Sequence, residues 1–181
     1  MKLSSFKFFG GKLTTLLALA LISSFYSCVD NWGREEPIVY TEFTPILLTR
    51  SSLETSVSLK PVTNIGDAAK IYYKDNFIFI SERFKGVHII DNTNPENPIN
   101  KGYIAVPGCV DMAIKNDILY VDNAVDLIAI NLTDAQKGTL NVVKRVLNVF
   151  PEVVPPDGGT VPSKFNIANR PKNTFIIGWK K

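Results

Sequence analysis

Three aspartates stand near the ends of apolar runs in the stretch "CVDMAIKNDILYVDNAVD", where their carboxylates could act together. They are Asp111, Asp122 and Asp126. Two carboxylates at one site can serve as general acid and base, and each can contact a polar ligand. Aspartate is also a frequent turn former, because its side chain bonds to nearby backbone. We interpret the three residues as turn formers or as contacts on a ligand-binding face, and we predict no catalytic residue.

The other residues that could carry chemistry are isolated in the sequence. His88 is the only histidine and lies between apolar neighbours in "VHIID", which favours packing or a surface position over catalysis. The segment "DNTNPE", which starts at Asp91, is rich in oxygen atoms but lacks the glycine and distal glutamate of an EF-hand loop. Asx residues and proline in this order are typical of a turn. The sequence predicts no metal site and no cofactor.

The first 27 residues are typical of an export signal. The basic segment "MKLSSFKFFGGK" precedes an apolar run from Leu13 to Tyr26, which is shorter than the roughly 20 residues of a membrane span. Lys2, Lys7 and Lys12 account for the excess of basic residues, so the rest of the chain is balanced in charge. Because no basic stripe with aromatic residues follows, we predict no nucleic-acid partner.

Cys28 follows the apolar run directly, after "FYS". This stretch resembles a lipobox, in which a small residue, here Ser27, precedes a cysteine that is acylated and becomes the first mature residue. We expect residues 1–27 to be a lipoprotein signal peptide and Cys28 the lipidation site, with the acyl chains binding the membrane. The chain is then exported to the cell envelope, as an outer-membrane lipoprotein on its periplasmic or surface face. Ordinary signal cleavage and a Cys28–Cys109 disulfide are the alternatives, and an acylated Cys28 would leave Cys109 as a small buried residue.

The elements that must position these residues are mostly short strands. Residues 28–68 read as a tether with a short strand, "ILLTR", and a short helix that starts near Ser51. From residue 69 onward, runs of Ile, Val, Tyr and Phe alternate with Asn, Asp, Gly and Pro clusters, which predicts an all-β, antiparallel fold. "YYKDNFIFI" (72–80) also matches "AIKNDILYV" (113–121) at an offset of 41 residues, with four strands in each unit. That period is typical of a β-propeller blade.

The repeated units, with "IYYKDNFIFISERFKGVHIIDNTNPENPINKGYIAVPG" as the first, resemble the LVIVD repeats of bacterial propeller-like lipoproteins. The second unit, with "INLTDAQKG", lacks both prolines of the first. The resemblance implies export and propeller-like blades, and it implies no particular activity. We predict a first blade at 69–109, a second at 110–150, and a loop and the start of a third at 151–181.

Two blades and part of a third are fewer than a closed ring needs. We therefore expect either the N-terminal part of a longer, truncated product or units that associate between chains. The favoured function is a non-catalytic binding or scaffold module with a protein or polysaccharide ligand. An envelope hydrolase or lyase that uses a propeller face, and a nonfunctional truncated fragment, are the alternatives.

Overall fold

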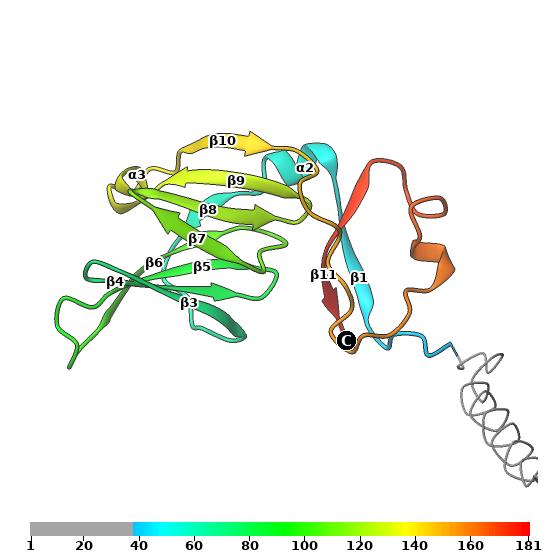
Figure 1. Cartoon of the computed structure of the whole chain (residues 1–181), viewed down its shortest axis with the longest axis horizontal. Helices are drawn as coiled ribbons and strands as arrows, with labels where there is room; N and C mark the ends of the chain where they lie inside the picture. Colours follow the sequence, from blue (N-terminus) through cyan, green and yellow to red (C-terminus); the bar gives the residue numbers. More distant parts are fainter. Residues whose placement is uncertain (1–37) are drawn as a thin grey trace, which may run out of the picture. The chain divides into compact units, whose positions relative to one another are not determined.

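The computed structural model describes residues 38–181, and these fold mainly into antiparallel β-sheets (Figure 1). The leader 1–27, Cys28 and the first part of the predicted tether lie outside the described residues. Within the described part of the chain, the strands form three sheets of five, four and two strands. The all-β, antiparallel class that the sequence predicts is confirmed.

The first sheet has the strand order β2-β6-β5-β4-β3. Its strands are β2 (Ser58–Lys60), β3 (Ala68–Lys74), β4 (Phe77–Glu82), β5 (Gly86–Asp91) and β6 (Ile99–Ala105). Strands β3 to β6 form a meander, because only short turns join them. The segment after β5 is such a turn: Asp91 accepts the Thr93 N–H at 3.0 Å and Asn94 accepts the Glu96 N–H at 3.2 Å. The turn role predicted for "DNTNPE" is therefore confirmed.

The second sheet repeats this meander with the order β10-β9-β8-β7. Its strands are β7 (Met112–Lys115), β8 (Ile118–Asn123), β9 (Asp126–Asn131) and β10 (Val142–Val146). The repeat in the sequence has a counterpart in the backbone. Asp75 and Asn116, which stand 41 positions apart, both have φ of 53° in the first turn of their sheets. Phe84 and Ala124 are likewise left-handed, at 63° and 57°, in the second turns.

The third sheet pairs the two ends of the described chain. Strand β1 (Thr44–Thr49) runs antiparallel to β11 (Thr174–Lys180), and Figure 1 shows the two side by side. The sequence predicts a strand at β11 but not its pairing with β1. The loop that contains Asp157 binds the residues just before β1. The Asp157 carboxylate accepts hydrogen bonds from the Thr41 hydroxyl at 2.8 Å and the Glu42 N–H at 3.0 Å.

Short helices connect the strands. Helix α2 (Arg50–Glu54) is capped by Thr49, whose hydroxyl accepts the Ser52 N–H at 3.2 Å. The predicted short helix thus starts one residue before Ser51, and β2 follows it at Ser58. Helix α3 (Leu132–Gln136) was not predicted, and a 3₁₀ turn, η2, covers Ser163–Phe165. Within residues 38–181, no helix has the length and apolar character that a membrane crossing requires.

The main core lies between the first and second sheets. The first sheet contributes Phe79, Val87, Ile89 and Ile104, and the second contributes Leu119, Val121, Ile128 and Ile130. Cys109 is buried in the same cluster, as the sequence predicts. The Tyr72 hydroxyl donates to the Ile114 carbonyl at 3.0 Å and links β3 to β7. The described residues form no closed barrel or propeller, so the assignment of the two larger sheets to propeller-like blades stays a prediction.

Candidate functional site

Asp126, the last of the three predicted aspartates, is fully buried and lies between two arginines. Its carboxylate accepts hydrogen bonds from Arg50 Nη1 at 2.6 Å, Arg145 Nη1 at 2.8 Å and the Asn148 N–H at 3.0 Å. Burial raises the pKa of Asp126, but the hydrogen bonds from Arg50, Asn148 and Arg145 outweigh it, so the pKa lies below its ordinary value. The carboxylate is ionised and its oxygens are occupied by structural partners.

The arginines around Asp126 connect several elements. Arg145, on β10, also donates to the buried Asn123 side chain at 2.8 Å. Arg50, on α2, lies with its guanidinium 4.2 Å from the centre of the Phe175 ring on β11. Through these contacts Asp126 joins the second sheet to α2 and to the two-stranded sheet. Its role is to hold elements together.

Asp122 binds backbone on the other side of the second sheet. Asp122 pairs with Leu127 across the two strands, and the next residue, Asn123, pairs with Asp126. Because successive residues of a strand alternate between faces, the carboxylates of Asp122 and Asp126 lie on opposite faces of the sheet. The Asp122 carboxylate accepts the Val110 N–H at 2.9 Å and the Asp111 N–H at 2.8 Å. Burial raises its pKa despite these bonds. Asp122 therefore fixes the chain that enters β7, which is the turn-forming role weighed for it.

Asp111 is exposed and forms a surface ion pair. Its Oδ1 lies 2.5 Å from Lys70 Nζ on β3 and accepts the Met112 N–H at 2.6 Å. The Lys70 ammonium beside it lowers the pKa of Asp111. Of the three predicted residues, Asp111 and Asp122 lie together and Asp126 lies apart. The two carboxylates that lie together are both engaged, Asp111 by the Lys70 ammonium and Asp122 by backbone N–H groups.

Asp111 and Asp122 border a groove of about 600 Å³ at the outer face of the second sheet. Most of the side chains along it are apolar, and they include Phe84, Val110, Tyr120, Leu127, Phe150 and Val154. Its charged residues are already engaged: Lys70 pairs with Asp111, and Arg83 pairs with Asp67 at 3.5 Å. Glu152 pairs with Arg170 at 2.5 Å, and Asp122 binds backbone N–H groups. A groove of this kind can hold apolar groups of a ligand with charges at its border.

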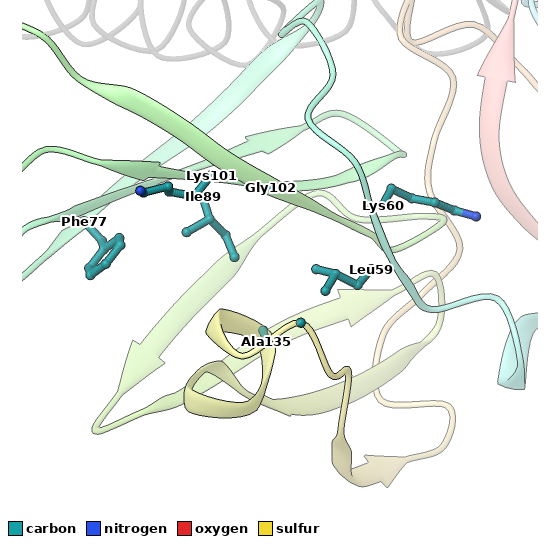
Figure 2. A pocket seen from close by; sticks show the side chains of 8 residues that line it. Leu59, Lys60, Phe77, Ile89, Lys101, Gly102 and Ala135 are labelled. Atoms are coloured by element: carbon teal, nitrogen blue, oxygen red, sulfur yellow. The ribbon is translucent and has the colours of Figure 1, made fainter.

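A separate cavity of about 390 Å³ lies between the first sheet and α3 (Figure 2). In Figure 2, Leu59, Phe77 and Ile89 extend from the sheet toward α3, whereas the amine of Lys60 points away. Gly102 is part of the wall, and a Cβ added there would meet no atom within 4 Å. Two lysines stand in the lining of this cavity, and the second of them, Lys101, is paired with Asp91 at 3.6 Å.

His88 is fully buried in the first sheet, so of the packing and surface positions that the sequence left open for it, it takes the packing position. Its Nε2 lies 3.0 Å from Glu82 Oε2, and its ring centre lies 4.6 Å from that of Tyr103. Because a carboxylate only accepts, Nε2 carries the proton. Glu82 also accepts from Lys85 Nζ at 2.7 Å. Burial raises the pKa of Glu82, but the hydrogen bonds from Lys85 and His88 outweigh it and leave the pKa lowered.

Among residues 38–181, no three His, Cys, Asp or Glu side chains are grouped so that they could hold a metal ion. Comparisons with known protein families, with curated proteins and with solved structures found no match. The groove and the faces of the sheets are therefore interpreted from their own chemistry. Sequence reasoning missed Arg50 and Arg145, because no local pattern marks an arginine that meets a carboxylate from a distant strand.

Proposed function

We propose that the chain is a non-catalytic binding or scaffold module, anchored by lipid at Cys28 in the cell envelope and built from propeller-like LVIVD repeats. The leader and the position of Cys28 support the anchor. Two antiparallel meanders with equivalent turns support the repeat. The anchor holds the module at the membrane surface, where the groove can meet a partner.

The apolar groove beside Tyr120 is the observation that carries this proposal. The aspartates that could have acted as acid and base are ion-paired or bound to backbone, so they support structure rather than proton transfer. Aliphatic and aromatic side chains line most of the groove. A polysaccharide requires many hydrogen-bonding groups, whereas a protein segment can place apolar side chains there. A protein partner is therefore the ligand class we favour.

A photo-crosslinking amino acid at position 120 tests the groove. Tyr120→benzoylphenylalanine, introduced into the full chain in cells, is expected to give a discrete crosslinked protein adduct on irradiation. The same substitution at Ile167, an exposed position outside the groove lining, is the control and should give none. Denaturing gels and mass spectrometry of the membrane fraction provide the readout. Absence of an adduct at position 120, or equal adducts at both positions, would argue against a groove-bound partner.

The lipid anchor has its own test. Cells fed an alkyne-labelled fatty acid are expected to label the full chain, and Cys28→Ser should abolish both the label and the membrane association. Cys109→Ala is the matched control and should keep the label, because that thiol is buried in the core. Labelling that survives Cys28→Ser would place the anchor elsewhere and remove this part of the proposal.

A further inference from the structure

One face of the first sheet carries four large apolar side chains, of which two are exposed and two are half-buried. We call Ile71, Tyr73, Ile78 and Ile80 the open face. They are neighbours across β3 and β4, since Ile71 pairs with Ile80 and Tyr73 with Ile78. Ile71 is 66% exposed and Tyr73 is 61% exposed, whereas Ile78 and Ile80 are half-buried. A contiguous apolar surface of this kind commonly marks an interface.

The repeat shows what covers the equivalent face in the second sheet. At the offset of 41 residues, the open face corresponds to Met112, Ile114, Leu119 and Val121. Met112 is only 2% exposed and Ile114 only 7% exposed. Both belong to the main core, packed against the first sheet. In the second sheet this face is thus buried by the sheet of the preceding repeat.

The complementary surface is the outer face of the second sheet, which we define as Ala113, Ile118 and Tyr120. At the same offset it corresponds to Tyr72, Phe77 and Phe79 of the first sheet, which pack against the second sheet. Phe79 is 2% exposed, whereas its equivalent Tyr120 is 37% exposed. The open face and the outer face are thus the two kinds of surface that pack together between the sheets. Within the described residues, neither of them packs against a surface of the other kind.

We propose that a second copy of this chain provides the counterpart, with the outer face of one copy packed against the open face of the next. This inference rests on the proposed function, because it names the partner that meets Tyr120. The packing of the two sheets within one chain is the template for the contact. The two faces come from different repeats, so the contact is head-to-tail and leads to a ring or a filament.

Charge at the border of the sheets agrees with this pairing. Within the chain, Lys70 of the first repeat is paired with Asp111 of the second. These two residues occupy equivalent positions, 41 apart. A head-to-tail contact would bring Asp111 of one copy to the position next to Lys70 of the other, so the charges at this point are opposite again. Opposite charges across an interface favour the correct register.

Two charge substitutions on the full chain in detergent test the head-to-tail contact by sedimentation velocity. The unmodified chain is expected to associate with increasing concentration. Ile71→Arg, on the open face, and Tyr120→Arg, on the outer face, should each give monomers. A mixture of the two variants should give a dimer and nothing larger, because one intact face remains on each. Val62→Arg, at an exposed loop position, is the control and should associate like the unmodified chain.

Circular dichroism melts check that each variant is folded, and Tyr73→Arg serves as a second open-face variant. A monomeric unmodified chain, or oligomers of Tyr120→Arg alone, would overturn the inference. The crosslink at position 120 distinguishes failure of the head-to-tail contact from failure of the proposed binding function. An adduct of twice the chain mass supports the second copy. An adduct with a different protein overturns the second copy and leaves the binding function in place, whereas no adduct from a monomer counts against both.

Discussion

Asp126→Ala is expected to lower the free energy of unfolding by about 3–5 kcal/mol, the largest effect of any single polar substitution considered. The buried carboxylate accepts hydrogen bonds from Arg50, Arg145 and the Asn148 backbone. Its removal leaves two guanidinium groups without their anion in a region where water replaces it poorly. The contacts between the second sheet, α2 and β11 should loosen together.

Urea unfolding followed by circular dichroism measures this effect. Asp111→Ala is the matched control, because its ion pair with Lys70 is exposed and should contribute no more than about 1 kcal/mol. Equal losses in the two variants would contradict the structural role assigned to Asp126.

The same residue gives a pH dependence with a defined sign. Its pKa in the folded chain lies below the ordinary value of 3.8. A carboxyl of this kind contributes its full stabilisation above the ordinary pKa and loses it as the pH falls through the lower, folded-state pKa. Stability should therefore decline below about pH 4, and the decline should be smaller in Asp126→Asn.

Gly86→Ala is the second substitution with a large expected effect, a loss of about 2–4 kcal/mol in the free energy of unfolding. Gly86 starts β5 with φ of 154°, and an added Cβ would lie 2.1 Å from the Ile104 carbonyl oxygen. The Val106 nitrogen would lie only 2.9 Å away. Because backbone atoms limit the space, no side-chain rotation can relieve the contact, and β5 and β6 must separate locally.

Gly102→Ala, on β6 of the same sheet, is the control for Gly86→Ala. A Cβ at position 102 meets open space at the cavity shown in Figure 2. The substitution should be neutral or should stabilise by about 0.5–1 kcal/mol, since alanine restricts the unfolded chain more than glycine does. Thermal and urea unfolding of the two variants provide the comparison. A Gly86→Ala loss no larger than that of Gly102→Ala would show that β5 and β6 tolerate the contact.

The strands of the two larger sheets were predictable because their signals are local. The segments "FIFISE" and "ILYVDN" coincide with β4 and β8. Their preceding turns, Asp75-Asn76 and Asn116-Asp117, use residues that tolerate the left-handed backbone found at Asp75 and Asn116. The offset between these turns also indicated two equivalent meanders.

Features that depend on distant parts of the chain were not predictable in the same way. Strand β2 was not predicted, because its serine-rich segment follows directly after a helix start. The segment becomes a strand by pairing with β6. Helix α3 is only five residues long and carries no sustained period. The candidate aspartates were found from their positions at strand ends. Their partners were not, because a residue such as Arg50 meets Asp126 only after the fold has formed.

The pairing of β1 with β11 has a consequence for the order of folding during synthesis. The hairpins of the two larger sheets join neighbouring segments and can form early, whereas β1 must wait for a strand from the far end of the described chain. Until then β1 presents an unpaired edge to its surroundings. The two-stranded sheet can therefore form only after both larger sheets have been synthesised, and during that interval the edge of β1 is open to wrong pairings with other molecules.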